Sequence, residues 1–200
     1  MFFSSDGVSD GDIIPLVTER MEATIKLTEV RKLHDIIKRM FPSHAFLDRI
    51  HIPYSTATFP SSTPKGASNV AIALGLREHQ TIKTLIFETD KDERVLVMVG
   101  GDQNVISGHL KKVLGSRNIQ LASPDKVIQT TGYQIGSIPP FSWQPDGFRS
   151  FLDMDMMNEV ILAVGAGIWG NEIFISPTNL VTASQSMVVN LTDREKPVFL

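Results

Sequence analysis

The stretch that most constrains this chain is Thr81–Phe87, seven residues in which branched and aromatic side chains surround a single lysine. This composition is typical of a β-strand, whose successive side chains point to opposite faces. Both faces of this strand are largely apolar, so we expect it to be covered on both sides. Lys83 must then reach water from the start of the strand, or lose part of its hydration and direct its charge at a ligand.

The composition excludes several classes of protein. The chain has 200 residues, a net charge of −3 and no cysteine, which excludes disulfides, thiolate zinc sites and a cysteine nucleophile. The overall acidity argues against a strongly basic nucleic-acid binder but allows a local basic patch. The most apolar run, Val160 to Trp169, is about half the ~20 residues that a membrane-spanning helix needs. The amino terminus lacks the pattern of a secretory signal, so we expect a cytoplasmic protein.

Short strands interleaved with short helices predict an α+β fold with a mixed sheet. A long amphipathic helix is expected from Leu16 to Phe41, ended by Pro42. Further helices are expected at Val70–Leu74, Val105–Leu114, from Ser123-Pro124 to Gly132, and from Ser176-Pro177. Strands are expected at Phe46–Tyr54, Thr81–Phe87, Arg94–Val99, Asn118–Ala122, Val160–Val164 and Glu172–Ile175, with a loop at Ser55–Ser68.

Six segments in a fixed order carry a family resemblance. They are Ala71–Leu76; Ile82–Leu85; Gly101-Asp102 with Leu110–Gly115; Ala122–Pro124; Thr131–Pro140, which contains a Gly-x-x-x-Pro loop; and Gly165, Gly167 and Ile173–Pro177. In this order they resemble the YbaK/ProX family of aminoacyl-tRNA deacylases, which includes the editing-type domains of prolyl-tRNA synthetases. The resemblance covers roughly Glu29 to Ser184.

The resemblance implies a fold, an activity and partners. The fold would be a mixed, partly barrel-like β-sheet surrounded by short helices, with a tail and the start of a helical extension at residues 1–27 and the deacylase-like domain at 28–200. The activity would be hydrolysis of the ester that joins an amino acid to the 3′-terminal ribose of a mischarged tRNA. The partners would be the aminoacylated 3′ end of tRNA and an aminoacyl-tRNA synthetase or multi-synthetase complex. No cofactor and no metal is expected.

Candidate site residues follow from the resemblance and from the chemistry of the side chains. Lys83 and the backbone around Gly136 would stabilise negative charge during hydrolysis. Thr84 offers a hydroxyl, although a regular strand would direct it to the face opposite Lys83. The remaining substrate-binding candidates are Ser137, Ile138, Pro139, Pro140, Gly165 and Gly167, and the candidate phosphate contacts are Lys65, Lys111, Lys112 and Arg117, for which a solvated surface is an equal alternative.

The loop departs from the family pattern, and some alternatives remain open. Where the family has Gly-Gly-x-Ser-Pro, this chain has Ser137 and Pro139 in place of the second glycine and the serine, so we expect a stiff loop that admits only a small amino acid. Asp153 and Asp155 are interpreted as a solvated edge rather than as paired carboxylates. The glycine-rich segment Gly165–Gly170 is interpreted as a hairpin turn. A non-catalytic module that binds aminoacyl-tRNA or docks on a synthetase is the alternative function.

Overall fold

The computed structural model describes residues 26, 29, 32, 36 and 41–192, and the chain divides into two compact units, Met1–Met40 and Phe41–Leu200. In the first unit the four described residues are helical and exposed. The rest of the helix expected from Leu16 to Phe41 lies outside the described residues. The boundary expected between residues 27 and 28 therefore stays a prediction, and the fold below is that of the second unit.

The second unit contains two sheets. The larger has the strand order β4(Ile119–Leu121), β2(Ile82–Thr89), β3(Arg94–Gly100), β5(Ser150–Asp153), β8(Met187–Val189), and the smaller has the order β1(Ser55–Thr58), β7(Asn171–Ile175), β6(Leu162–Gly165). β2 runs antiparallel to β3 and β4, whereas β3–β5 and β5–β8 are parallel pairs. One parallel bridge between Thr81 and Ala163 links the two sheets. The expected α+β fold with a mixed sheet is confirmed, and over residues 41–192 the strands do not close into a barrel.

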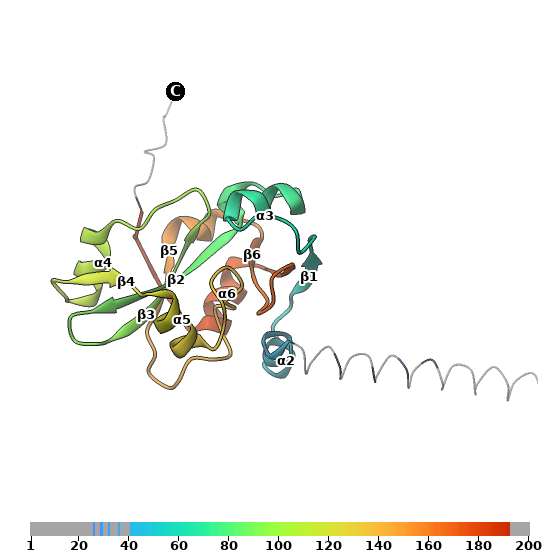
Figure 1. Cartoon of the computed structure of the whole chain (residues 1–200), viewed down its shortest axis with the longest axis horizontal. Helices are drawn as coiled ribbons and strands as arrows, with labels where there is room; N and C mark the ends of the chain where they lie inside the picture. Colours follow the sequence, from blue (N-terminus) through green and yellow to red (C-terminus); the bar gives the residue numbers. More distant parts are fainter. Residues whose placement is uncertain (1–25, 27–28, 30–31, 33–35, 37–40, 193–200) are drawn as a thin grey trace, which may run out of the picture. The chain divides into compact units, whose positions relative to one another are not determined.

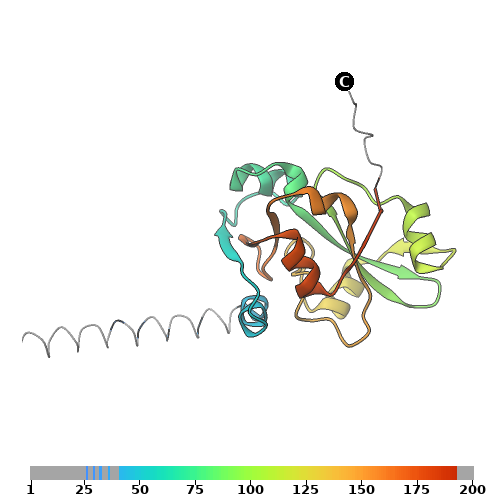
Figure 2. The same ribbon diagram turned by 180° about the vertical axis from the view of Figure 1, so that it is seen from behind.

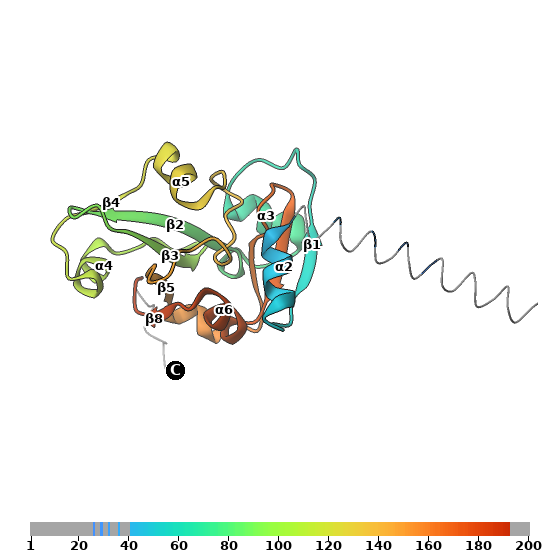
Figure 3. The ribbon, with the colours of Figure 1, turned by 90° about the horizontal axis from the view of Figure 1, so that it is seen from below.

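Short helices surround the sheets: α2(Pro42–Arg49), α3(Ala67–Leu74), α4(Ser107–Leu114), α5(Pro124–Thr131) and α6(Pro177–Ser184), with 3₁₀ turns η1(Glu78–Gln80) and η2(Met154–Asn158). Figure 1 shows α4 at one end of the β2–β3 hairpin and α3 at the other, with α6 seen from behind in Figure 2. From below, β4 and α5 lie toward one edge of the larger sheet, and β8 and α6 toward the other (Figure 3).

The central hairpin is buried on both faces, as the sequence pattern predicted. Along β3, Val95, Val97 and Val99 join one apolar cluster together with residues of α4. Leu96 and Met98 point the other way, into a larger cluster formed with α2, α5, α6 and the smaller sheet. Because strand side chains alternate, two separate cores on one hairpin require a nearly continuous apolar sequence.

Helix boundaries follow ordinary capping chemistry. Ser123 and Ser176 accept hydrogen bonds from the first turns of α5 and α6, each of which has proline at its start. The same rule explains an expectation that was wrong. Phe46–Tyr54 is not a strand, because Pro42 begins helix α2 instead of only ending the preceding one. The segment expected to be a loop from Ser55 contains the short edge strand β1.

A tight turn closes β3 over the start of β2. A methyl group added to Gly101 would lie 2.5 Å from the Glu78 carbonyl oxygen and 2.6 Å from the Ala67 Cβ. No real Cβ is found at such distances from backbone, so only glycine lets this turn pack against η1 and α3. Two residues further on, the Gln103 carbonyl accepts a hydrogen bond from the Lys83 ammonium group. The turn therefore orients the lysine.

We expect Gly101→Ala to destabilise the protein by about 1–3 kcal/mol, because the turn must move away from η1. Chemical unfolding measures this effect. Gly108→Ala is the matched control: Gly108 lies in α4 with open space around its Cα, so alanine there should be neutral or stabilising by up to about 1 kcal/mol. Equal stability changes in the two variants would contradict the close approach at Gly101.

Candidate active site

A cavity of about 260 Å³ lies along the edge of β2 that β3 does not cover. β4 pairs only with residues 87–89 of this edge, and the bridge to β6 is at Thr81. Between them, the edge has no strand partner within the described residues. The Ile86 carbonyl faces this edge, since it accepts from the Ala122 amide. In a strand the backbone groups alternate between the two edges, so Thr84 presents its own N–H and C=O to the cavity.

The open edge explains why Lys83 and Thr84 both line the cavity, although the alternation of a regular strand predicted opposite faces. Side chains from both faces of a strand can reach a cavity that lies beside the strand's edge. A cavity above a sheet is reached only by the side chains of one face. The Thr84 hydroxyl is buried without a hydrogen-bond partner, as is that of Thr81. The β2 wall of the cavity thus carries one cation, Lys83, and two unpaired hydroxyl groups.

Lys83 keeps a single hydrogen bond, to the Gln103 carbonyl. Burial lowers the pKa of its ammonium group, while the carboxylates of Glu78 and Asp102 oppose that shift. A partly desolvated cation interacts more strongly with negative charge than one in water. This supports the interpretation of Lys83 as a functional charge over that of a lysine extending freely into solvent.

The loop Gly136–Pro140 forms the opposite wall. Gly136 has φ +97°, and a methyl group there would lie 3.4 Å from the Trp169 ring. Behind the loop, Gly165 of β6 allows a closer approach: its added Cβ would lie 2.7 Å from the Ser137 carbonyl carbon. The absence of a side chain at Gly165 therefore allows the loop to lie directly on β6 and face the cavity.

Only part of this loop is available to a ligand. The Ser137 amide and hydroxyl both donate to the Gln134 carbonyl, and prolines 139 and 140 have no N–H group. Ser137 instead faces a neighbouring recess that Gly167 also lines, and the two prolines are buried. Within the described residues, Gly136 and Ile138 retain amides without an intramolecular partner. They are the loop groups that could donate to a substrate oxygen.

Trp169 and Lys65 connect the cavity to the neighbouring recess, since both side chains line the two hollows. The Trp169 ring meets Phe59 edge-on at 5.0 Å between centroids, and its indole N–H donates to the Thr63 carbonyl at 3.3 Å. The Lys65 ammonium group donates to the Ile135 carbonyl at 3.1 Å and is exposed. Sequence reasoning named Lys65 but missed Trp169, whose only signal was its place in the glycine-rich turn.

Glu172 is the site residue that sequence reasoning missed. It lines the same cavity from β7, is 5% exposed, and has no hydrogen bond or ion pair within the described part of the chain. Burial raises the pKa of its carboxyl group to about 8. Both β1 and β6, the strands that flank β7, are free of titratable side chains. The cavity therefore combines a weakened acid with a cation, Lys83, on another wall.

The remaining predicted cations lie elsewhere. Lys111, Lys112 and Arg117 belong to α4 and the turn before β4, at the hairpin end of β2. Because β4 starts opposite Thr89, six residues beyond Lys83, this end lies about 20 Å along the strand from Lys83. The structure brings only Lys65 to the cavity, so a phosphate contact by the other three would involve a more distant part of a tRNA.

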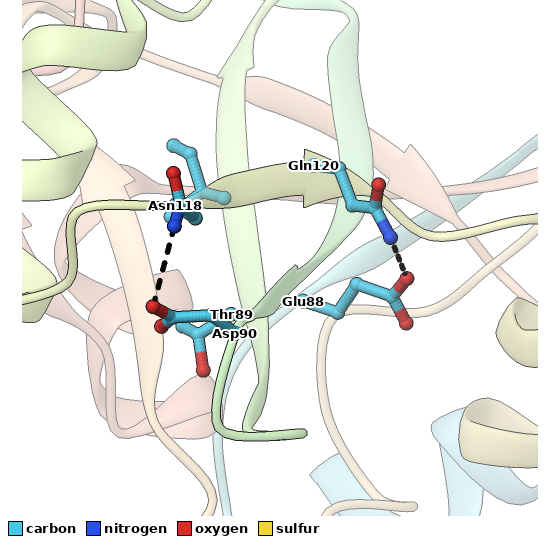
Figure 4. A pocket seen from close by; sticks show the side chains of 6 residues that line it. Glu88, Thr89, Asp90, Asn118 and Gln120 are labelled. Carbon is cyan, nitrogen blue, oxygen red and sulfur yellow. Dashed lines mark hydrogen bonds between the residues drawn. The ribbon is translucent and has the colours of Figure 1, made fainter.

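The hairpin end carries its own polar recess, shown in Figure 4. There the Glu88 carboxylate accepts hydrogen bonds from Lys126 and Gln120, which hold its pKa below the usual range. Asp90 accepts from Ser116 and Asn118. Every acid in this recess is already paired, so the recess fastens β4 to β2 and offers no unsatisfied group to a ligand.

The acidic pair expected at a solvated edge is also structural. Asp153 is buried, caps η2 by accepting from the Asp155 amide, and accepts from the amides of Leu191 and Thr192. The expectation of a solvated Asp153 was wrong, because β5 runs inside the sheet between β3 and β8. Asp155 lies 3.4 Å from His79, whose other ring nitrogen contacts Asp102.

Comparison with known proteins places this geometry in a family. The model of the aminoacyl-tRNA editing domain matches residues 63–183, which include the whole cavity. The chain belongs to the aminoacyl-tRNA editing domain family. This confirms the resemblance to a family of aminoacyl-tRNA editing domains.

The relatives match different shares of the chain. Proline–tRNA ligases of Desulforamulus reducens and Streptococcus sanguinis are both 39% identical over 107 and 108 residues, about 52% of this chain. The matches span 18% and 17% of those ligases, so this chain corresponds to a small part of each. An Enterococcus faecalis protein provisionally named Cys-tRNA(Pro)/Cys-tRNA(Cys) deacylase is 24% identical, covering 72% of this chain and 88% of its own length.

Two solved structures share the fold. One, described as a candidate trans-editing enzyme for prolyl-tRNA synthetase, has a TM-score of 0.64 at 24% identity and covers 70% of this chain and 87% of its own. The other, named hypothetical protein APE2540, has a TM-score of 0.69 at 21% identity and covers 75% and 98%. At these identities the likeness establishes the editing-domain fold alone.

The buried Glu172 makes a prediction about stability. Its ordinary pKa is 4.5 and its folded pKa is about 8, so the folded protein retains a proton that the unfolded chain releases between these values. The free energy of unfolding must therefore fall as pH rises through that window, by about 2 kcal/mol between pH 6 and pH 8. Glu172→Gln removes the titration and should become increasingly more stable than the wild type toward pH 8.

Urea unfolding at several pH values measures this difference. Asp146→Asn, which removes an exposed carboxylate from the loop before β5, is the control and should follow the wild type at every pH. If Glu172→Gln and the wild type lose stability in parallel from pH 6 to pH 8, the carboxyl group is not held protonated by burial.

Proposed function

We propose that this chain is a trans-editing hydrolase that removes a small amino acid from the 3′ end of a mischarged tRNA. Membership of the editing-domain family supports the reaction class. The observation that carries the proposal is the cavity itself, in which Lys83 and the free amides of Gly136 and Ile138 lie on facing walls. Developing negative charge on an ester oxygen is stabilised by such fixed donors.

The reaction requires only water and the ester. A water oxygen bonds to the carbonyl carbon, the bond from that carbon to the ribose oxygen breaks, and a proton from the water ends on the ribose oxygen. Negative charge develops on the carbonyl oxygen and then on the leaving oxygen. Lys83 is placed to stabilise it, either directly or by holding the adjoining phosphate, from a strand that is fixed on both faces.

The size of the cavity supports a small amino acid. Its volume of about 260 Å³ is below the roughly 300–1,000 Å³ of pockets that bury drug-sized ligands. Its apolar lining includes Val70, Ile82 and Ile138, which are well packed and buried. The buried prolines behind Ile138 limit any widening of the loop, because their φ angles are fixed.

The location and the non-catalytic alternative remain predictions. Over the described residues no helix is long and apolar enough to cross a membrane. The amino-terminal helix, on which a docking role would depend, falls mainly outside the described residues. The cavity offers no support for contact with a synthetase, whereas its donors support hydrolysis.

We expect Lys83→Ala to lower the rate of deacylation by about 10²–10³, because one preorganised electrostatic contact is lost. The fold should persist, since Lys83 makes only one hydrogen bond. Release of amino acid from charged tRNA measures the rate, and circular dichroism checks the fold. Lys91→Ala, in the exposed hairpin turn, is the control with the same charge change. Near wild-type turnover in Lys83→Ala would remove this residue from the chemistry.

We expect alanyl-tRNA to be cleaved and phenylalanyl-tRNA to be spared, because the loop and Trp169 leave no room for an aromatic side chain. Gly136→Val should block the reaction by adding bulk beside Trp169. Gly147→Val is the matched control: Gly147 also has a positive φ, +79°, but open space around it, so it tests backbone strain away from the cavity. Equal cleavage of the two tRNAs would refute this account of the loop.

A further inference from the structure

The cavity contains polar groups that hydrolysis, as described above, does not use. The hydroxyls of Thr81 and Thr84 are buried on its wall without hydrogen-bond partners, and the Glu172 side chain, which is 5% exposed, has no hydrogen bond or ion pair within the described residues. Buried polar groups in folded proteins are nearly always paired, and each unpaired one costs stability. Three such groups around one hollow indicate that a polar part of a ligand completes them.

Strand register places two of these groups on the same side of the smaller sheet. Glu172 lies directly opposite Gly165 in the β6–β7 pair. Thr81 is bridged to Ala163, which lies two residues before Gly165 and therefore on the same face of β6. Because Gly165 has no side chain, nothing from β6 stands between Glu172 and the cavity. Thr84 borders the same hollow from β2.

All three groups can accept hydrogen bonds. A carboxylate accepts only, and a threonine hydroxyl offers two lone pairs. Their best common partner is a compact cation with three N–H donors. An aminoacyl ester carries such a group beside its reacting carbonyl, the α-ammonium group. The ammonium groups of Lys65 and Lys83 are the titratable groups that line the cavity with Glu172 within the described residues. Of these, Lys83 already donates to Gln103 and Lys65 to Ile135.

We infer that Glu172, with Thr81 and Thr84, binds the α-ammonium group of the aminoacyl moiety. This inference rests on the proposed function for the identity of the ligand. It makes Glu172 a substrate-binding residue that fixes which way the ester enters: amino group toward β7, carbonyl toward Lys83 and the loop amides. An ester whose amino group is acylated would lack both the charge and two of the three donors.

Burial explains why such a pair would be selective. Burial raises the pKa of the Glu172 carboxyl group because it disfavours the charged form. A positive charge placed beside the group lowers that pKa again and stabilises the carboxylate. A bound ammonium group supplies that charge, whereas a neutral amide leaves the carboxylate desolvated and unpaired. Discrimination between a hydrogen-bonded polar group and its blocked analogue is the kind of selectivity that small cavities achieve best.

A pair of non-hydrolysable ligands tests this directly by calorimetry: 3′-alanylamino-3′-deoxyadenosine and its N-acetyl derivative. The wild type should bind the free-ammonium ligand about 10- to 100-fold more tightly than the acetylated one. In Glu172→Gln this preference should fall to within about threefold, through weaker binding of the free-ammonium ligand. The control Asp146→Asn should keep the full preference. Thr84→Val should reduce it by a smaller factor.

Three results would overturn the inference: no measurable binding of the free-ammonium ligand, equal binding of both ligands by the wild type, or an undiminished preference in Glu172→Gln. Deacylation of alanyl-tRNA by the wild type is measured separately. Absence of that activity with the ligand preference intact would refute the proposed hydrolase while leaving the ammonium site. Deacylation activity without a preference for the free-ammonium ligand would refute the ammonium site while leaving the proposed hydrolase.

Discussion

The structure depends on one strand, β2, whose second edge is only partly paired. Its first edge is fully bonded to β3, and both of its faces are covered by apolar clusters, so the strand cannot shift. Its other edge pairs with β4 at one end and touches β6 at Thr81. The cavity fills the interval, so the backbone groups of Thr84 that a complete sheet would have paired are left for a ligand.

A second constraint maintains this interval. The loop that faces β2 rests on β6 through contact with Gly165, at a distance that no side chain would permit. The Trp143 indole and the Gln144 amide donate to the carbonyls of Pro139 and Pro140, which anchors the far end of the loop. Stiffness therefore comes from the support beneath the loop as well as from its prolines. This is consistent with a site that selects by fixed shape.

Much of this fold could be predicted from the sequence, because its signals are local. The caps at Ser123 and Ser176 and the glycines after α3, α4 and α5 mark helix ends through residues that are neighbours in the chain. The segments that were wrong or missed depend on distant partners. β1 and β8 are short edge strands that exist only because β7 and β5 lie beside them. Pro42 was ambiguous because proline both ends one helix and begins another.

The residues of the candidate site likewise include one that the sequence indicated, Lys83, and one that it did not, Glu172. Lys83 stood out because a lysine in an apolar strand conflicts with its surroundings, and such conflicts mark functional positions. Glu172 gave no such signal: on a strand with Ile173 and Ile175 buried on one face, a glutamate on the other is ordinarily solvated. It is buried because β7 is the central strand of its sheet and because the side chain lies inside the cavity, whose other walls shield it from solvent.

Lys83 and Glu172 are thus held in the cavity by different parts of the fold, and this bears on what the site can recognise. Lys83 is held by the turn at Gly101–Gln103 on one side of the hollow, and Glu172 by the smaller sheet on the other. Because a rigid frame holds Lys83 and Glu172 on different walls, the two groups are not paired with each other. They retain the ability to bind a ligand that is itself dipolar, with a cationic end and an end where negative charge develops. An aminoacyl ester has that character along its length, which is why one cavity with a cation, Lys83, on one wall and a buried acid, Glu172, on another suits it better than a simple anion or a simple cation.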